Sequence, residues 1–254
     1  FSLGLERNAL TISDSSSDEV RSFVIENNED LDAGSDVREE DYDTVFASVN
    51  FSIDSRNRLI FPDSGSLNSI GLEAHTGELD FYKSFYRHQS VFPVGSNVTF
   101  SFKGLISYGS AYGETTDFPF FSKYTAGGVR TVRGYDYNSL GPQDSRGDVL
   151  GGNLRVVTNA EFLFPVEALG SAESFRLGLY FDAGNVFANT DAYDTSDLRS
   201  SIGISAKWFT LIGPIQLSYA VPVNDKPGDD IENFQFSLGA FGISFFVVYH
   251  CYCV

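Results

Sequence analysis

Short segments in which apolar and polar residues alternate recur along this chain, and this alternation limits what the chain can fold into. Each segment is about ten residues long, the length with which a tilted β-strand crosses a lipid bilayer. We place about eleven such segments and predict an antiparallel all-β fold. They are Phe1–Thr11, Glu19–Asn27, Tyr42–Ile53, Ser66–Thr76, Glu78–Val91, Ser96–Tyr108, Gly152–Phe164, Ser174–Phe187, Leu198–Trp208, Gly213–Val221 and Asn233–Gly239.

The segment Tyr42–Ile53 shows the pattern well. Val45 and Phe51 fall on one face of the expected strand, whereas Thr44 and Ser48 fall on the other. One face suits lipid and the other suits water, as in a transmembrane β-barrel. A soluble β-sandwich would turn the same apolar face inward, so periodicity alone leaves both architectures open.

Composition narrows the class of protein. The 254 residues contain 24 Phe and 13 Tyr, but no run of about eighteen apolar residues that would predict a spanning helix. The net charge of -17 speaks against a nucleic-acid partner, because phosphates require clusters of Lys and Arg. Much of this acidity lies between Asp14 and Asp43. We interpret that stretch as a solvated loop rather than a cation site, because it has no calcium-loop spacing.

The two ends of the chain carry little functional signal of their own. Cys251 and Cys253 are the only cysteines, so no disulfide framework is expected, and two thiols alone make a poor metal site. The first residues, Phe1 to Ile12, have no basic start, apolar block or cleavage site of a signal peptide. We therefore expect that the chain begins within a longer protein.

An enzyme is not expected. His75, His88 and His250 are scattered, and no Ser-His-Asp or metal-ligand spacing can be read. The pair Gly127-Gly128 lacks the Lys-Ser/Thr of a phosphate-binding loop. We predict neither a metal nor a cofactor.

The longest connection between predicted strands, 109–151, is rich in glycine and contains Val132-Arg133-Gly134-Tyr135, called the loop motif below. A compact domain rarely leaves so long a connection unstructured, so we expect this one to be functional or folded back on the strands.

The loop motif belongs to an ordered series of short stretches, and the series resembles the BamA superfamily of outer-membrane insertases and polypeptide transporters. A lone Val-Arg-Gly-Tyr would occur by chance in many proteins, but the whole series in order would not. The stretches are 121–128 (FSKYTAGG), 131–135 (TVRGY), 138–142 (NSLGP), 151–153 (GGN), 159–162 (NAEF), 180–186 (YFDAGNV), 213–220 (GPIQLSYA) and 234–239 (FQFSLG).

The resemblance implies periplasmic POTRA domains followed by an outer-membrane barrel of about sixteen strands, of which this sequence would supply the last eleven or so. We therefore predict an incomplete transmembrane barrel over 1–241, with 109–151 folded into its lumen and an atypical tail at 242–254. An open sheet would leave unpaired edges in lipid, so further N-terminal strands are expected to close the barrel.

In this superfamily the loop motif lies inside the barrel, which implies that Arg133 is surrounded by inward-facing polar groups. The resemblance implies that Glu161 and Asp182 accept its hydrogen bonds. Strand parity agrees, because both carboxylates alternate with apolar neighbours. The alternative for Arg133 is an exposed loop arginine without partners. Gly134 is expected at a tight turn with positive φ, and Tyr135 is expected to anchor the loop against the barrel wall.

The last predicted strand resembles the C-terminal β-signal that this machinery recognises in its clients. Its lipid-facing residues would be Phe234, Phe236 and Leu238, followed by Gly239 and a terminal aromatic, Phe241. The chain departs from the family pattern because an apolar tail continues through 242–254, too short to span a bilayer as a helix.

The function that the resemblance implies is insertion of unfolded β-barrel clients into the outer membrane through a lateral seam, with POTRA domains and accessory lipoproteins as partners. Its physical basis would be the pairing of a client strand with an exposed sheet edge. The alternative is a polypeptide translocase of the same superfamily, similar to TamA or the two-partner secretion transporters. A soluble β-sandwich binding module is the remaining possibility.

Overall fold

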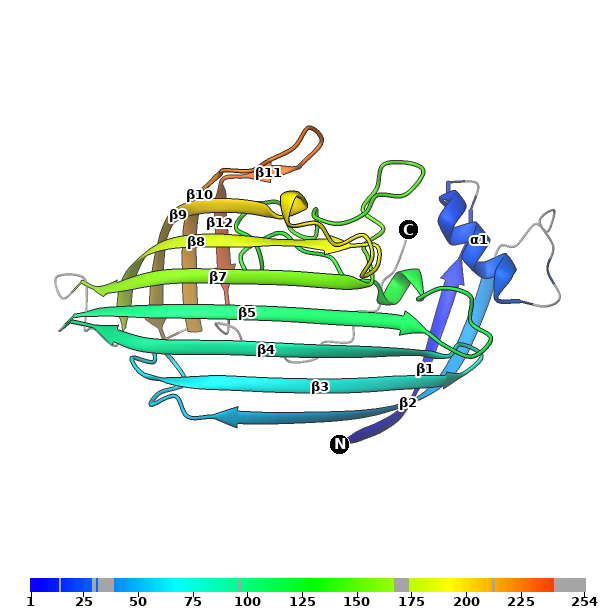
Figure 1. Ribbon diagram of the computed structural model, residues 1–254, viewed down its shortest axis with the longest axis horizontal. Coiled ribbons are helices and arrows are strands. Elements are labelled where there is room, and N and C mark those ends of the chain that lie inside the picture. Colours follow the sequence, from blue (N-terminus) through cyan, green and yellow to red (C-terminus); the bar gives the residue numbers. More distant parts are fainter. Residues whose placement is uncertain are drawn as a thin grey trace.

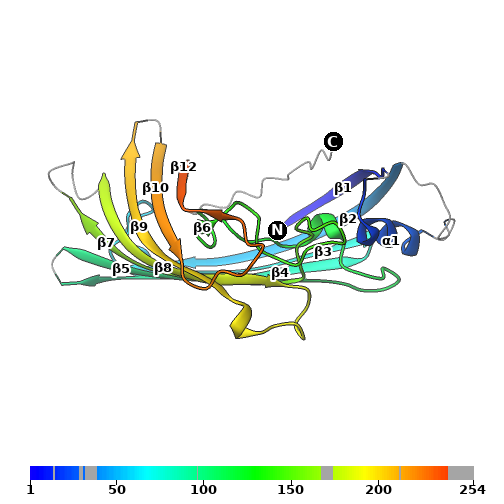
Figure 2. The same ribbon diagram turned by 90° about the horizontal axis from the view of Figure 1, so that it is seen from above.

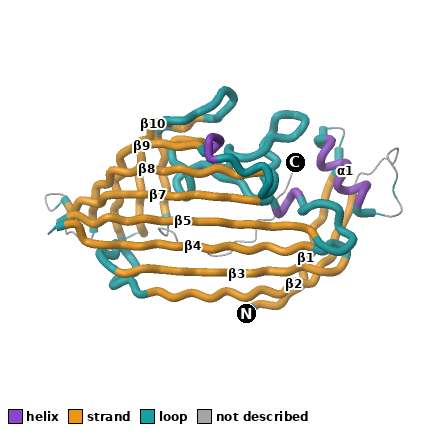
Figure 3. Tube along the Cα trace, viewed as in Figure 1, coloured by secondary structure: helices purple, strands orange, loops and turns teal. Residues whose placement is uncertain are grey.

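The computed structural model describes residues 1–13, 15–28, 31, 39–95, 97–166, 174–211 and 213–239, and most of them form one antiparallel sheet of ten strands (Figures 1 and 3). Neighbours in the sheet are neighbours in the chain, except that the two-residue strands β6 and β11 are left out and pair with each other. The strands, in sheet order, are β1 (Ser2–Thr11), β2 (Glu39–Asp54), β3 (Gly65–Gly77), β4 (Phe81–Val94), β5 (Val98–Ala111), β7 (Leu154–Pro165), β8 (Phe175–Phe187), β9 (Arg199–Thr210), β10 (Gly213–Pro222) and β12 (Phe234–Leu238).

The sheet is strongly curved, as part of a barrel wall is (Figure 2). Within the described residues it is unclosed, with β1 at one edge and β12 at the other. The connection from β5 to β7 lies on the concave side, which is the barrel lumen (Figure 2). It contains the 3-10 turn η1 (Phe120–Ser122) and the two-residue strand β6 (Gly134–Tyr135), which pairs with β11 (Ile231–Glu232). A second 3-10 turn, η3 (Thr195–Asp197), precedes β9.

The two faces of the sheet decide between barrel and sandwich. On β2, Val45 and Phe51 are 42% and 61% exposed, whereas Thr44 and Ser48 on the opposite face are buried. The strand β8 repeats this, with exposed Leu179 and buried Asp182. The apolar residues therefore point outward to where lipid lies and the polar ones point into the lumen, opposite to a soluble β-sandwich. The barrel prediction is confirmed and the sandwich alternative is wrong.

Ten of the eleven predicted strands are present, with ends that shift by a few residues, but the prediction for Glu19–Asn27 is wrong. This stretch lies in the helix α1 (Asp18–Glu26), within the predicted acidic loop. Val20, Phe23 and Val24 have the i, i+3, i+4 spacing of one helical face. Acidic residues in the first turn also suit the positive end of the helix dipole.

The buried face of α1 packs beside the sheet. Phe23 and Val24 are buried in a cluster with Tyr42 of β2 and Phe81 of β4. The ring of Phe23 meets that of Tyr42 edge-on, with 6.2 Å between centroids. Tertiary packing of this face therefore selects a helix where short-range alternation suggested a strand. Across the described ranges, no helix has the length and apolar character needed to cross a membrane.

Candidate functional site

The connection between β5 and β7 folds back into the lumen and is held there by backbone hydrogen bonds. Tyr124 and Gly152 form an isolated bridge, as do Ala126 and Leu140. The amide of Gly128 donates to the carbonyl of Tyr135 (2.9 Å), which closes the turn that carries the loop motif. The backbone is thus paired even where the connection has no regular structure.

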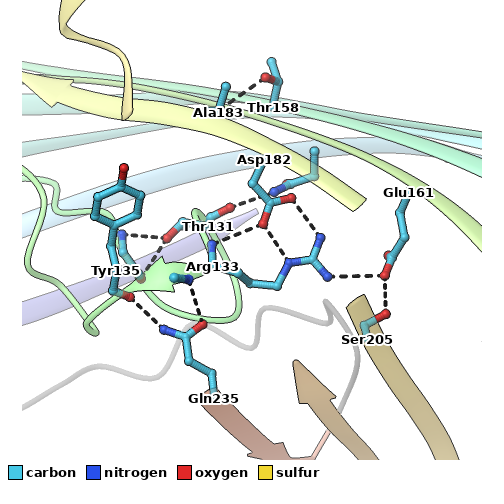
Figure 4. Close-up of polar contacts among 12 residues, drawn as sticks. Thr131, Arg133, Tyr135, Thr158, Glu161, Asp182, Ala183, Ser205 and Gln235 are labelled. Atoms are coloured by element: carbon cyan, nitrogen blue, oxygen red, sulfur yellow. Dashed lines mark hydrogen bonds and ion pairs between the residues drawn. The ribbon is translucent and has the colours of Figure 1, made fainter. Parts of the chain in front are cut away.

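Arg133 lies at the centre of this region and contacts two wall strands (Figure 4). Its Nε donates to Oδ2 of Asp182 at 2.6 Å, and its Nη2 donates to Oδ1 at 2.8 Å. The backbone amide of Arg133 also donates to Oδ2 of Asp182, at 3.1 Å. Its Nη1 donates to Oε1 of Glu161 at 3.2 Å. The structure thus places the two expected carboxylates, from β8 and β7, on the guanidinium.

Glu161 is itself held by two residues of β9. Ser205 Oγ donates to Oε1 of Glu161 at 2.6 Å, and the ammonium of Lys207 forms an ion pair with Oε2. Arg133 also lies over the ring of Tyr180, 3.3 Å from its centroid. Burial disfavours the charged guanidinium, but Asp182 and Glu161 outweigh this and raise the pKa of Arg133 above its ordinary value. The group is a buried, charged network that fixes the loop.

Gly134 has the backbone conformation that the sequence predicts, with a φ of 91°. Only glycine adopts this region without strain. A Cβ at this position would lie 2.8 Å from Cβ of Ala220 on β10, closer than real carbon atoms approach. The glycine therefore allows both the turn and the close approach of the loop to the wall.

Val132 and Tyr135 anchor the loop by packing. Both are fully buried, in a cluster that includes Val157 of β7 and Val186 of β8. The hydroxyl of Tyr135 donates to the carbonyl of Ser200 at 3.2 Å. Burial raises the pKa of Tyr135 to about 12. Apolar packing and one hydrogen bond thus anchor the loop on either side of the charged Arg133.

Gln235 of β12 is a further site residue, which the sequence reasoning missed. Its Nε2 donates to the carbonyl of Tyr135 at 2.7 Å, and its Oε1 accepts from the amide of Gly134 at 3.4 Å (Figure 4). It is 3% exposed. The alternation of Phe234, Gln235 and Phe236 already placed a lone amide on the lumen face, which is the signal that could have found it.

The candidate seam residues occupy the outer face of β12. Phe234, Phe236 and Leu238 are 60%, 57% and 54% exposed, as lipid-facing side chains would be. Gly239 follows with a φ of 127°, and its amide donates to Pro214 at 2.9 Å. Phe241 and the tail 242–254, with Cys251, Cys253 and His250, lie outside the described residues.

The lumen beside the loop motif contains a cavity of about 350 Å3 with a basic lining. Among the described lining residues seven are Lys or Arg, including Lys103, Arg130 and Arg155, whereas Glu161 is the one carboxylate. This cluster was not visible in the sequence, because its members are spread over positions 56–207 and converge only through the sheet.

The remaining candidates for chemistry are engaged structurally. His75 stacks on Phe81 with 4.1 Å between centroids and contacts Glu73, with 3.0 Å between Nε2 and Oε1. His88 contacts Asn68, with 2.8 Å between Nδ1 and Oδ1. In the part of the chain that the structure covers, no three His, Cys, Asp or Glu side chains gather as a metal site would require.

Comparisons with known proteins agree with this architecture. The family model of the Omp85 superfamily domain matches residues 1–241. The outer membrane protein assembly factor BamA of Neisseria meningitidis serogroup B is 30% identical over 223 residues, covering 76% of this chain and 28% of the relative. BamA of Nitratidesulfovibrio vulgaris is 26% identical over 226 residues, covering 84% and 28%.

A solved structure is also similar in fold. The crystal structure of BamA from Haemophilus ducreyi lacking POTRA domains 1–3 has a TM-score of 0.82 and 24% identity, covering 92% of this chain and 49% of that one. The chain thus spans less than a third of the length of the two BamA relatives and about half of the solved chain.

Proposed function

The chain belongs to the Omp85 superfamily as part of a bacterial outer-membrane β-barrel, and from this membership we propose that its protein inserts unfolded β-barrel proteins into the outer membrane. Both BamA relatives are named outer membrane protein assembly factors. We propose that clients leave through a seam that β12 borders, and that POTRA domains and accessory lipoproteins take part. We propose that the protein pairs β-strands and does not catalyse a reaction. The two carboxylates that could act as acid and base, Glu161 and Asp182, already form ion pairs with Arg133 and Lys207.

The edge position of β12 is the observation that carries this proposal. Among the described strands, β12 has a single neighbour, β10. It is 5 residues long, whereas β4 and β5 have 14 each. A short edge strand offers unpaired N–H and C=O groups to an incoming strand, and few pairs hold it in place. Client strands would pair there and then leave into the bilayer past the lipid-facing Phe234 and Phe236.

A cross-linking experiment tests the seam. The full-length protein, with Cys251 and Cys253 replaced by Ser, is reconstituted in liposomes with Ser237→Cys on β12 and an unfolded client that carries a cysteine in its last strand. We expect a disulfide to the client and heat-modifiable mobility of the inserted client. The matched control is Ser218→Cys on β10, which lies between β9 and β12 and should not react.

Two results would contradict the proposal. Equal cross-linking at Ser237→Cys and Ser218→Cys would remove β12 as the docking edge. A client that becomes protease-protected in the liposome interior without acquiring heat-modifiable mobility would instead identify a polypeptide translocase.

A further inference from the structure

The loop motif joins two parts of the wall that are not neighbours in the sheet. Arg133 is held by Asp182 on β8 and Glu161 on β7, while the next two residues are held by Gln235 on β12. The strands β9 and β10 lie between β8 and β12. Three consecutive residues of the loop therefore connect two strands from the middle of the sheet, β7 and β8, with the edge strand β12 (Figure 4).

Gln235 provides both hydrogen-bond types that this connection needs. Its amide oxygen accepts from the amide of Gly134, and its amide nitrogen donates to the carbonyl of Tyr135. An apolar side chain would remove this acceptor from the amide of Gly134 and would leave the carbonyl of Tyr135 with the amide of Gly128 alone, and lost hydrogen bonds of buried polar groups are costly. A glutamine is suited to the position because its side-chain amide is at once a donor and an acceptor.

The segment just before β12 is fastened to the same residues. The strand β11 pairs with β6, with Ile231 opposite Tyr135 and Glu232 opposite Gly134. The amide of Asp136 donates to the carbonyl of Asp230 at 2.9 Å. Residues 230, 231, 232 and 235 thus contact positions 134–136, at and just after the end of the loop motif. Among the described residues, the ladder of β12 within the sheet is with β10, from Ile215 opposite Leu238 to Tyr219 opposite Phe234.

We propose that Gln235 is a positioning residue that makes the loop motif a brace for the edge strand. The brace consists of Arg133, Gly134 and Tyr135 with their contacts to Asp182, Glu161 and Gln235. Detachment of β12 from β10 then requires the brace to be broken as well, so the edge strand and the Arg133 network open together. This coupling follows from the fold, and only its use in client insertion rests on the proposed function.

Hydrogen exchange tests the brace in the full-length protein in lipid nanodiscs. Gln235→Leu keeps a side chain of similar size but removes the hydrogen bonds to Gly134, Tyr135 and Glu232, and we expect the backbone amides of 234–238 to exchange on the order of ten-fold faster. Gln216→Leu is the matched control, because Gln216 is a buried lumen-facing glutamine on β10. It lies opposite Ser237 of β12, so it reports the effect of the same substitution on the β10–β12 ladder, and it should accelerate the exchange of β12 less than Gln235→Leu does.

A remote variant separates the brace from a local packing effect. Asp182→Asn changes a residue that two strands, β9 and β10, separate from β12, yet it should accelerate exchange in 234–238 more than in β3 and β4, which a general loss of stability would affect equally. In the double variant Asp182→Asn/Gln235→Leu, exchange should accelerate by less than the product of the two separate fold-changes, because both substitutions break the same connection. Gln235→Glu retains the acceptor for Gly134 but sets a carboxylate oxygen against the carbonyl of Tyr135 and the carboxylate of Glu232, so it should also accelerate exchange in 234–238.

The outcomes are distinguishable. Unchanged exchange of β12 in Gln235→Leu relative to Gln216→Leu, or in Asp182→Asn relative to wild type, would overturn the brace. If a client-insertion assay fails with the wild-type protein while the exchange remains coupled, the proposed function is lost and the brace stands. If Gln235→Leu lacks heat-modifiable mobility, Gln235→Glu carries the comparison, and wild-type exchange in that variant overturns the brace.

Discussion

Asp182→Asn is the sharpest test of the Arg133 network, because one carboxylate holds most of the guanidinium. Asp182 is fully buried and accepts three hydrogen bonds from Arg133, at 2.6, 2.8 and 3.1 Å. In the variant an amide NH2 group replaces one carboxylate oxygen, so that a donor faces the donating guanidinium of Arg133. The charge of Arg133 is then left with Glu161, which Lys207 shares. Removing one partner of a buried pair costs about 3–5 kcal/mol, a large part of the about 5–15 kcal/mol that stabilises a typical fold.

The matched control is Asp43→Asn. Asp43 forms the same two-pronged contact with Arg7, at 2.6 and 2.5 Å, but the side chains of Arg7 and Asp43 are 65% and 53% exposed. Water and salt screen such a pair, so its loss should barely change stability. The two variants therefore differ in burial while sharing the chemistry and geometry of the lost contact.

The assay is urea-dependent unfolding of the full-length protein in detergent micelles, followed by heat-modifiable mobility. We expect the unfolding midpoint of Asp182→Asn to fall well below that of wild type, and that of Asp43→Asn to stay close to it. Equal midpoints for the two variants would refute the reasoning, since burial would then make no difference to the worth of the pair.

Three further predictions concern the loop motif. Arg133→Ala should weaken barrel assembly, and exchanging the residues at positions 133 and 182 should recover part of the lost assembly, measured as heat-modifiable mobility in cells. Gly134→Ala should destabilise the fold in urea more than Gly147→Ala, because both glycines have positive φ but only the first is crowded. Tyr135 has a folded pKa of about 12 against an ordinary 10.0, so the unfolded state loses its proton first. The stability from this group is complete below pH 10 and declines as pH rises towards 12; Tyr135→Phe should remove that part of the alkaline loss of folded mobility, and an unchanged loss would contradict it.

Much of the fold could be predicted from the sequence, because a strand with one face in lipid and one in the lumen must alternate. The pattern of Val45, Ser48 and Phe51 was sufficient to place β2. It was not sufficient to say which face is outside, which depends on the curvature of the whole sheet. The helix α1 was missed because Glu19–Asn27 satisfies a two-residue period loosely, whereas the burial of Phe23 that selects the helix depends on distant strands.

Some residues of the site could likewise be predicted from the sequence and others could not. Gly134 was predictable from backbone chemistry, and the polar parity of Glu161 and Asp182 from their strands. The choice of Arg133 as their partner came from resemblance, since no local pattern says where a long connection folds back. The contacts of Gln235 with the loop motif were not predictable. Gln235 contacts β6, and a strand of two residues is too short to show the alternation that would identify it in the sequence.

The contacts of Arg133, Gly134 and Tyr135 span very different lengths of chain, and this orders their formation. The bond from Arg133 to Glu161 closes a loop of 28 residues, the bonds to Asp182 close 49, and those to Gln235 close 100 or 101. The entropy lost in loop closure rises with the logarithm of loop length, so the last contact costs about 1 kcal/mol more than the first. A chain made from its N-terminus also supplies Gln235 last. The pairings between neighbouring strands of the wall, including that of β12 with β10, are thus favoured to form first, and the contact of Gln235 with the loop motif closes last.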